Sequence, residues 1–300
     1  MSELLEKHGF KFQKKFGQNF LTDPKIPARI AQNCVENELF DKDFTENTDD
    51  NGQITPRRPC AILEIGPGAG ILTKELAKRF TTVCAVEIDQ NLIPVLDESL
   101  QGYDNASVIN ADILECDLNE LYNKLSCGKL PVGVCANLPY YITTPIIMTL
   151  IESRLPFCYI TVMVQKEVAK RLTALPKSAD YGAITAVIGL YGSAKKLFDV
   201  SAGSFHPRPN VDSSVVRIKL DNPLKLDDDD IKNASRLIKA GFGMRRKTLA
   251  NALCPLFPEY DKATLSKRIS EILNVSETVR GEELCAREYV TLANQLCHTE

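Results

Sequence analysis

The chain has 300 residues, of which 44% are hydrophobic and 25% are charged, and its formal net charge is -3 at pH 7. This length and composition predict a soluble globular protein of one large or two ordinary domains, and no apolar run approaches the length of a membrane span. The negative charge argues against a protein that binds nucleic acid over its whole surface.

The ten cysteines are scattered along the chain, and none forms a Cys-x-x-Cys pair. Several lie within apolar runs (Cys84, Cys135 and Cys158), where a free cysteine packs as a small hydrophobic residue. We therefore expect no zinc or other metal site and no disulfide framework. Because residues 1–20 also lack the apolar core of a signal peptide, we expect a cytoplasmic protein that does not associate with membranes.

The N-terminal part of the chain combines a basic arm with a polar insertion. Residues Met1–Lys15 carry Lys7, Lys11, Lys14 and Lys15 and are predicted to form a mobile arm, for which we expect phosphate contacts unless its charges are merely solvated. A helix is expected after the start signal Asp23-Pro24. The stretch Lys42–Pro59 is rich in Asp, Asn, Thr and Pro, so we expect a flexible insertion there.

From residue 61 onward, short apolar runs alternate with helical patterns, which indicates βαβ units and a mainly parallel sheet covered on both faces. The expected strands are Ala61–Ile65, Val83–Ile88, Ala106–Ile109, Val132–Ala136, Tyr159–Gln165, Ala194–Val200 and Ser214–Leu220. The expected helices are Ile71–Phe80, Asn91–Leu100, Pro145–Glu152 and Glu167–Leu175.

After the break at Asp221-Asn222-Pro223, only helical periodicity remains. We therefore predict an α/β domain over residues 1–221 and a smaller all-helical domain over residues 222–300. The helical domain carries the basic run Arg245-Arg246-Lys247, for which we expect phosphate contacts. A solvated face is the alternative interpretation of this run, and also of the acidic runs Asp41–Asp50 and Asp227–Asp230.

The first predicted strand ends in a glycine-rich turn, Gly66-Pro67-Gly68-Ala69-Gly70, which opens a helix. Glycines allow the backbone to approach a ligand closely, and the helix N-terminus offers unpaired amides. Carboxylates stand at the ends of the first three strands, as Glu64, Glu87 and Asp112. Because the carboxyl ends of parallel strands meet at one edge of a sheet, these groups predict a ligand site.

The chemistry of this edge fits S-adenosylmethionine. Glu87 suits the ribose hydroxyls, Asp112 the adenine amine and Glu64 the methionine ammonium group. NAD is the alternative ligand, but the spacing Gly66-x-Gly68-x-Gly70 lacks the last glycine of the dinucleotide pattern. For Asp112 and Glu64, a role as helix cap or turn acceptor also stays open.

The fourth predicted strand ends in Asn137-Leu138-Pro139-Tyr140. Asn137 offers a side-chain carbonyl, and Pro139 biases Leu138 toward extended geometry, so that its backbone carbonyl becomes a second acceptor. Tyr140 adds an aromatic face. Two acceptors beside a ring suit a nucleobase whose amino group is held outside its stack, whereas an ordinary turn with a half-buried tyrosine is the alternative.

Motifs along nearly the whole chain resemble the ribosomal RNA adenine dimethyltransferase family, most closely the branch that acts on small-subunit RNA. They are Lys15–Leu21, the Glu-Ile-Gly-Pro-Gly turn, Glu87, Asp112, Asn137–Tyr140, Phe205–Ser213 and Phe242–Leu249, in this order. The resemblance implies a Rossmann-like S-adenosylmethionine-dependent methyltransferase sheet over residues 1–221. It also implies a smaller C-terminal all-helical domain that recognises RNA over residues 222–300.

The resemblance also implies the roles of individual residues. It assigns cofactor contacts to Asn19, Leu21, Gly66, Glu87, Asp112 and Asn137. It implies that Asn137 and the Leu138 carbonyl, held in place by Pro139, bind the target N6 while Tyr140 and Phe205 stack on the adenine. Sulfonium methyl transfer then rests mainly on positioning, and no Cys or His nucleophile is needed.

Members of this family transfer two methyl groups to each of two adjacent adenines near the 3′ end of small-subunit RNA. The resemblance therefore implies an immature 30S-type subunit as partner and a role in ribosome biogenesis, and we expect a monomer. The acidic insertion and the negative net charge depart from what is usual in an RNA enzyme, and they concern RNA affinity more than the chemistry.

Four alternatives stay open. A large-subunit adenine methyltransferase of the antibiotic-resistance type would share the site, although Phe242–Leu249 favours the small-subunit branch. A mitochondrial transcription factor on the same fold would mainly bind nucleic acid, but an Arg-rich leader is missing. A nicotinamide-dependent dehydrogenase and a structural assembly factor are the other two.

Overall fold

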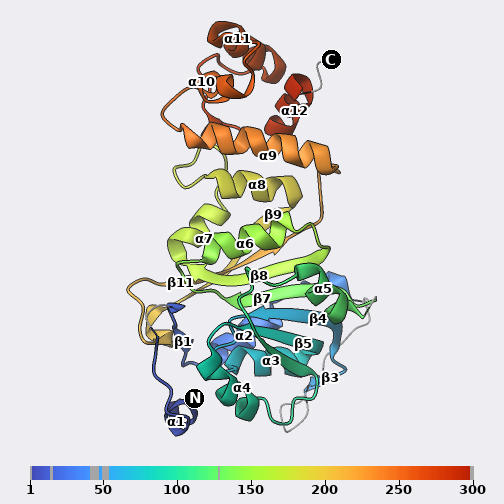
Figure 1. Ribbon diagram of the computed structural model, residues 1–300, viewed down its shortest axis with the longest axis vertical. Coiled ribbons are helices and arrows are strands. Elements are labelled where there is room, and N and C mark those ends of the chain that lie inside the picture. The colour runs from blue at the N-terminus through green and yellow to red at the C-terminus, as the bar shows by residue number, and fades with distance from the viewer. Residues whose placement is uncertain (1, 14–15, 41–46, 49–53, 128, 298–300) are drawn as a thin grey trace. The chain divides into compact units, whose positions relative to one another are not determined.

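The structure is a computed structural model that describes residues 2–13, 16–40, 47–48, 54–127 and 129–297 (Figure 1). Its contacts divide the chain into two compact units. The first unit comprises Met1–Ala169 and Lys195–Leu220, and the second comprises Lys170–Ala194 and Asp221–Glu300.

The first unit is built on a seven-stranded sheet with the order β6-β5-β4-β7-β8-β11-β9. Its strands are β4 (Arg58–Ile65), β5 (Phe80–Glu87), β6 (Ala106–Asn110), β7 (Val132–Asn137), β8 (Phe157–Gln165), β9 (Ser193–Val200) and β11 (Ser213–Lys219). Strands β6, β5, β4, β7 and β8 are parallel, and β11 pairs with β8 antiparallel. The predicted mainly parallel sheet is thus confirmed.

The central strands of this sheet are buried, because apolar side chains on both of their faces pack in the core. Cys60 and Ile62 of β4 belong to a buried cluster with residues of the helices α2 (Lys25–Gln32) and α3 (Ile71–Arg79). Ala61 and Leu63, which alternate with them, are fully buried as well. A strand covered on both faces has no polar alternation, which is why Cys60–Leu63 within β4 form a continuous apolar run.

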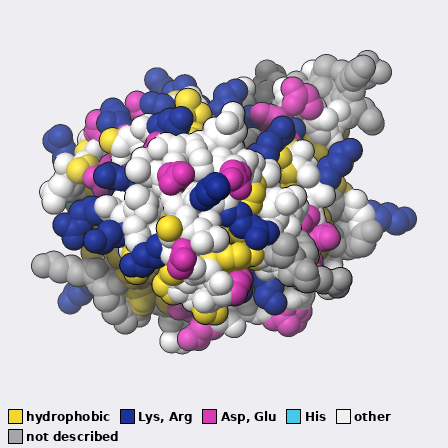
Figure 2. Space-filling view, turned by 90° about the horizontal axis from the view of Figure 1, so that it is seen from above, with side chains coloured by type: hydrophobic (Ala, Val, Ile, Leu, Met, Phe, Trp, Pro, Cys, Tyr) yellow, Lys and Arg dark blue, Asp and Glu magenta, His cyan; other side chains and the backbone are white. Residues whose placement is uncertain are grey.

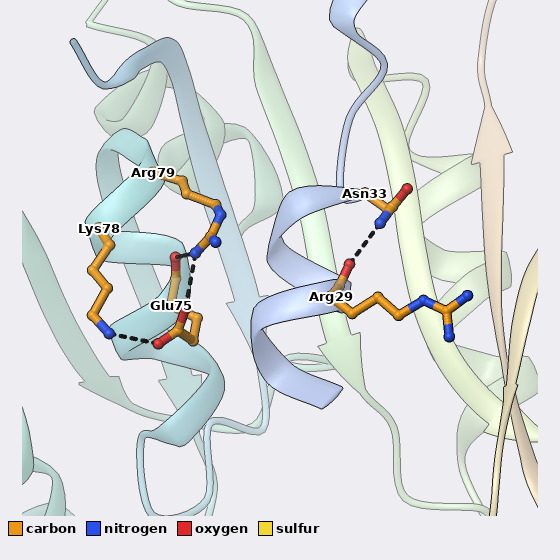
Figure 3. Close-up of polar contacts among 5 residues, drawn as sticks. All are labelled: Arg29, Asn33, Glu75, Lys78 and Arg79. Carbon is orange, nitrogen blue, oxygen red and sulfur yellow. Dashed lines mark hydrogen bonds and ion pairs between the residues drawn. The ribbon is translucent and has the colours of Figure 1, made fainter. Parts of the chain in front are cut away.

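Helices α2 and α3 pack side by side and carry their polar groups on the outside. Figure 3 shows Glu75 of α3 between Lys78 and Arg79, with ion pairs of 2.6 and 2.8 Å, while Arg29 of α2 points away from α3. The Asn33 side chain donates to the Arg29 carbonyl at 2.8 Å and so closes the end of α2. These partly buried pairs lie within one helix, where an ion pair adds little stability, and the apolar faces hold the two helices in place.

The remaining helices of the first unit are α1 (Ser2–Lys7), α4 (Ile93–Ser99), α5 (Leu118–Ser126), α6 (Thr143–Glu152) and the start of α7 (Lys166–Leu172). Helix α5 was not predicted. It begins at the N-cap Asp117, whose side chain accepts from the Asn119 and Glu120 amides at 2.8 and 3.2 Å. Its buried Leu118, Leu121 and Leu125 have helical spacing, so the sequence did contain this signal.

The N-terminal arm, expected to be mobile, packs against the first unit over its described residues. Leu5 is buried in a cluster with Phe20 and with Leu96 of α4. Lys7 and His8 contact Glu98 at 2.6 and 2.9 Å. Lys14 and Lys15 lie outside the described residues, so the phosphate contacts expected of this basic stretch stay a prediction.

Within the predicted flexible insertion Lys42–Pro59, the described residues form short extended pieces. Strand β2 (Asn47–Thr48) pairs antiparallel with β3 (Ile54–Thr55), and β4 begins at Arg58, earlier than expected. The other residues of the insertion, 42–46 and 49–53, lie outside the described part of the chain.

The second unit is helical, as expected, but it includes residues 170–194, which we had assigned to the first domain. The reason is α8 (Ala183–Tyr191), which was not predicted and packs against α9 (Asp228–Gly243) and α12 (Ala286–Cys297). Helix α8 is apolar on most sides, so it lacks the amphipathic period that identifies a surface helix. The other boundary, between residues 220 and 221, lies one residue from the predicted one.

Helices α10 (Leu249–Leu253) and α11 (Lys262–Leu273) complete this unit. The acidic run Asp227–Asp230 caps α9: the Asp227 side chain accepts from the amides of Asp229 and Asp230 at 3.0 and 2.9 Å. Carboxylates are favourable there because they face the positive end of the helix dipole. This run is therefore a helix cap as well as a solvated group of charges.

A close backbone approach in the second unit makes a test of its packing. Gly281 lies against Gly241 of α9, and a Cβ added at Gly281 would stand 2.8 Å from the carbonyl carbon of Gly241. We expect Gly281→Ala to lower the free energy of unfolding by about 1–3 kcal/mol, because backbone atoms cannot yield as a side chain can. Gly243→Ala is the matched control, since a Cβ there meets nothing within 4 Å. Thermal and urea unfolding measure the change. If Gly281→Ala and Gly243→Ala changed the free energy of unfolding equally, the close packing of Gly281 on Gly241 would be contradicted.

Candidate active site

The strand order reverses beside β4, and this reversal creates the site. The chain runs from β4 to β5 and β6 on one side, then returns to β7 on the other. Crevices at the carboxyl ends of strands on either side of such a switch point bind ligands in open α/β sheets. In the register of β4 and β7, Ile65 lies opposite Ala136, so the glycine turn and Asn137 follow side by side.

A cavity occupies this switch point and gathers most of the predicted site residues. It is lined by Phe16–Leu21, Glu64, Gly66–Ala69, Ile71, Leu72, Glu87, Ile88, Leu92 and Asn137–Tyr140. Of the six cofactor residues implied by the resemblance, five line it: Asn19, Leu21, Gly66, Glu87 and Asn137. The predicted tetrapeptide Asn137–Tyr140 lines the same cavity. The residues expected to bind the cofactor and those expected to bind the base therefore share one cavity.

The glycine turn has the backbone that its sequence suggested. Gly66, Gly68 and Gly70 have φ angles of 69°, 59° and 79°, in the left-handed region that favours glycine. A Cβ on Gly68 would stand 2.5 Å from the ring of Phe20, which covers the turn. Glycine at position 68 therefore permits both the backbone conformation and the close cover by the N-terminal segment.

Glu87, at the end of β5, is held by backbone amides. Its two carboxylate oxygens accept from the amides of Gly68 at 3.1 Å and Asp89 at 2.8 Å. Burial raises the pKa of Glu87 to about 7, and the two amides oppose that rise. The carboxylate thus ties the glycine turn to the end of β5, and lone pairs remain for a ligand's hydroxyl groups.

Glu64, near the end of β4, is a buried carboxyl group without a partner. Both of its oxygens are buried and have no hydrogen bond within the described structure. Burial raises the pKa of Glu64 to about 8. The Thr73 hydroxyl opposes this shift, but it too lacks a hydrogen bond of acceptable geometry, so it does not satisfy the carboxylate. A carboxyl group so placed fits a cationic ligand group.

The N-terminal segment covers the cavity through hydrogen bonds to the buried Asp89. The Gln18 side chain donates to Asp89 at 2.7 Å and the Gln13 side chain donates at 3.1 Å. The Gln18 side-chain oxygen in turn accepts from the Gln13 amide at 3.0 Å. No local pattern predicts this role of Gln13, Gln18 and Asp89, because an amide side chain carries no signal until the fold brings it to its acceptor.

Asn137 is oriented by the same segment. Its side-chain nitrogen donates to the Asn19 carbonyl at 3.1 Å. Only the NH₂ end of the amide can donate, so this contact assigns the Oδ1 atom as the free acceptor. The Leu138 amide donates to the Met163 carbonyl at 3.2 Å, and among the described residues no donor occupies the Leu138 carbonyl. The two acceptors proposed from the sequence are thus both present.

Tyr140 lines the cavity with a half-buried ring. Its hydroxyl lies 2.8 Å from the Ser213 hydroxyl. Burial raises the pKa of Tyr140, while Ser213 opposes the shift. Ser213 closes the predicted motif Phe205–Ser213, and its contact with Tyr140 was not foreseen.

Two predicted residues do not line the cavity. Asp112 is partly exposed after β6 and accepts from the Leu114 amide at 2.9 Å, so it acts as a turn acceptor here. Phe205 lies in β10 (Phe205–His206), pairs with β1 (Phe20–Leu21) and is only 4% exposed. Its ring belongs to the core cluster that also holds Leu21, so stacking on a base would require it or its neighbours to move.

Three broad features of the described residues bear on other chemistries. No group of three or more His, Cys, Asp or Glu is arranged to hold a metal ion. No described helix is long and apolar enough to cross a bilayer. All ten cysteines are free, and burial raises the pKa of Cys84.

The site is that of a Rossmann-like α/β protein that binds an adenosine ligand. Its features are the glycine turn, the carboxylate at the end of the next strand and the partnerless carboxyl group, all at the switch point of the sheet. Comparison with known proteins makes this specific. Residues 9–291 match the family model of ribosomal RNA adenine dimethylase. The chain belongs to the ribosomal RNA adenine dimethylase family, as the motifs had indicated.

Curated relatives cover almost the whole chain. A protein of Lachnoclostridium phytofermentans named ribosomal RNA small subunit methyltransferase A is 43% identical, over 97% of this chain and 94% of the relative. A protein of the same name from Streptococcus agalactiae is 41% identical, over 98% of this chain and 94% of its own length. One from Bacillus pumilus is 39% identical, with coverages of 98% and 94%.

Solved structures share the fold. A dimethyladenosine transferase from Plasmodium falciparum superposes with a TM-score of 0.69 at 24% identity, over 91% of this chain and 95% of that one. The 23S rRNA methyltransferase ErmE superposes with a TM-score of 0.65 at 24% identity, over 93% and 100%. The predicted fold class, a Rossmann-like methyltransferase sheet with a helical C-terminal part, is therefore confirmed.

The chain is thus an rRNA adenine dimethyltransferase, and the expected cofactor, S-adenosylmethionine, is confirmed by the family. The site fits that cofactor on its own evidence, because the partnerless Glu64 carboxyl group suits an ammonium group. Family membership sets aside the dehydrogenase alternative.

The charge state of Glu64 makes cofactor affinity depend on pH. Its pKa of about 8 means that it is largely protonated at neutral pH in the free protein, whereas a cationic ligand favours the ionised form. We expect affinity to rise as the pH rises from about 6 to about 7, with proton release on binding; an α-amino group, whose pKa is about 7.7–8.0, keeps most of its proton over this range. Glu87, with a pKa of about 7, adds to the slope in the same direction.

Glu64→Gln should weaken S-adenosylmethionine binding by about ten- to a hundredfold and flatten this slope, since a charge-assisted hydrogen bond is lost. Calorimetry in two buffers of different ionisation enthalpy measures both quantities. Glu75→Gln is the matched control, because that carboxylate pairs with Lys78 and Arg79 of its own helix and does not line the cavity. Unchanged affinity and unchanged proton release in Glu64→Gln would exclude Glu64 from the site.

Proposed function

We propose that the protein dimethylates the N6 amines of two adjacent adenines near the 3′ end of small-subunit ribosomal RNA, acting as a cytoplasmic monomer on an immature 30S-type subunit. The observation that carries the chemistry is the presence of the Asn137 and Leu138 acceptors and the Tyr140 ring in one cavity with the glycine turn. The small-subunit target rests on relatives of that name at 39–43% identity, against 24% for the 23S enzyme ErmE.

When bound, S-adenosylmethionine supplies an activated sulfonium methyl group. The protein's task is then to aim the adenine nitrogen, whose lone pair is delocalised into the ring. In this proposal, the Asn137 Oδ1 atom and the Leu138 carbonyl accept from the two N6 hydrogens before the first transfer, one of them accepts from the single remaining hydrogen before the second, and both favour a pyramidal nitrogen. As each N–CH₃ bond forms, the sulfonium S–CH₃ bond breaks and one N6 proton passes to solvent. Positioning of this kind supplies much of the acceleration, without a nucleophilic side chain.

The remaining site residues support that arrangement. Asn19 holds the Asn137 amide with its oxygen free, and Pro139 shapes the turn that presents the Leu138 carbonyl. Leu21, Gly66 and Glu87 would contact the cofactor, as would Asp112 after its carboxylate leaves the Leu114 amide. Tyr140 would stack on the flipped base, with Phe205 as a second face once it is uncovered. Stacking of one base contributes roughly 1–3 kcal/mol.

RNA binding is assigned to local basic patches. Arg245, Arg246 and Lys247 are all exposed in the turn between α9 and α10. Arg245 also donates to the Tyr181 carbonyl at 3.2 Å and lies 3.6 Å from Glu282, which leaves Arg246 and Lys247 as the better phosphate ligands. Figure 2 shows Lys and Arg scattered among Asp and Glu on the face displayed, in keeping with local contacts rather than a continuous basic surface.

The proposed role of Asn137 is tested by Asn137→Ala. We expect methyl transfer to fall at least a hundredfold, since the variant loses an acceptor for N6 and the contact with Asn19. Asn137→Asp keeps an acceptor but loses the NH₂ donor, so it separates the two effects. Far-ultraviolet circular dichroism checks the fold, and substantial activity in Asn137→Ala would remove this residue from the mechanism.

The substrate is tested by incubating the protein with labelled S-adenosylmethionine and unmodified small or large ribosomal subunits. We expect label in the small subunit, recovered as N6,N6-dimethyladenosine from adjacent positions near the 3′ end. Label confined to the large subunit would refute the proposed target. Binding to the small subunit without transfer would favour a structural assembly factor.

The basic turn is tested by the double variant Arg246→Glu/Lys247→Glu. We expect weaker RNA binding and a shallower dependence of log affinity on log salt, because fewer phosphates are neutralised. Cofactor affinity should not change. Lys267→Glu is the control, because Lys267 is an exposed lysine on α11 whose partner is Glu271. An equal loss of cofactor affinity, or an equal effect of the control, would contradict the assignment.

A further inference from the structure

The Tyr140 hydroxyl is bound by a serine from a distant strand. Ser213, the first residue of β11, is fully buried, and its hydroxyl lies 2.8 Å from that of Tyr140. Tyr140 follows β7, and β8 lies between β7 and β11 in the sheet. The tyrosine side chain therefore reaches across the end of β8 to its partner.

This contact restrains the ring in a specific way. The phenol oxygen lies on the axis about which the ring rotates, so a hydrogen bond there fixes where the axis points. A tyrosine whose axis is free loses side-chain entropy when it stacks on a base, and a restrained one has already lost it. A buried serine cannot follow a moving ring, because its strand is paired with β8 through Ser213 and Gln165.

The next residue shows that the contact is selective. Ser214 is as buried as Ser213, but its side chain points to the other face of the strand and donates to Asp199 at 2.6 Å. Two adjacent serines thus anchor two different elements, and only Ser213 reaches the cavity lining through Tyr140.

We propose that Ser213 is a positioning residue for methyl transfer, which holds Tyr140 in the orientation that stacks on the target adenine. The inference rests on the proposed function of Tyr140. Ser213 does not touch the substrate, and its effect passes through the tyrosine alone.

The test compares Ser213→Ala, Tyr140→Phe, the double variant and Ser214→Ala on small ribosomal subunits. Ser213→Ala and Tyr140→Phe remove the same hydrogen bond from opposite ends while the ring remains. Each should lower kcat by about three- to tenfold, and the double variant should lose no more than either single variant. KM for the subunit and the affinity for S-adenosylmethionine should stay unchanged.

A second readout separates positioning from general destabilisation. A loosely held ring should slow the second methyl transfer, which must act on a bulkier amine, so the share of N6-monomethyladenosine at equal conversion should rise. A smaller active fraction of enzyme would leave that share unchanged. Ser214→Ala should match the wild-type protein in kcat and in product ratio.

Several results would overturn the proposal. Equal effects of Ser213→Ala and Ser214→Ala, additive losses in the double variant, or a wild-type product ratio would each do so. If Ser213→Ala fails to fold, Tyr140→Phe still tests the proposal. A wild-type kcat in Tyr140→Phe would refute the positioning role of Ser213. Failure of the proposed function itself is distinct, because the wild-type protein would then transfer no methyl group to the small subunit.

Discussion

The parallel pairing of β4 with β7 is the constraint on which the rest of the site depends. It places Ile65 opposite Ala136, so the two loops that leave these strands begin side by side. A Cβ on Gly66 would meet the Asn137 carbonyl at 4.0 Å, which shows how closely the glycine turn and the acceptor loop approach. A cofactor and a target base could share one cavity because β4 and β7 end at the same register position at the carboxyl edge of the sheet.

The site is assembled at a cost in stability that a ligand would offset. Glu64 is buried without a partner, and its pKa rises from 4.5 to about 8. A carboxyl group whose folded pKa is raised favours folding while it is protonated, and it loses that contribution as the pH rises from about 4.5 to about 8. The free protein therefore carries a destabilising group near neutral pH, as functional sites commonly do.

Elements with a clear local pattern were predicted from the sequence, whereas an element defined only by its tertiary packing was not. The seven strands were all anticipated, because runs such as Val132–Ala136 are apolar on both faces and are bounded by turn residues. Helix α8 was not, since an apolar segment without an amphipathic period cannot be told from a buried strand. Without that helix, residues 170–194 read as part of the α/β domain, whereas their contacts group them with the helical unit. Helix α5 does carry a local signal, its Asp117 cap and its leucines at helical spacing, although we did not predict it.

By itself the sequence determined the family, the order of the seven strands of the main sheet and the identity of the residues at strand ends, because these depend on neighbours along the chain. Tertiary structure alone decided which of them meet. Asn19 and Asn137 are 118 positions apart and Tyr140 and Ser213 are 73 apart, yet each pair shares a hydrogen bond. The fold also placed Phe205 in the core rather than in the cavity. Contacts between distant segments depend on sheet register and burial, which no local pattern encodes.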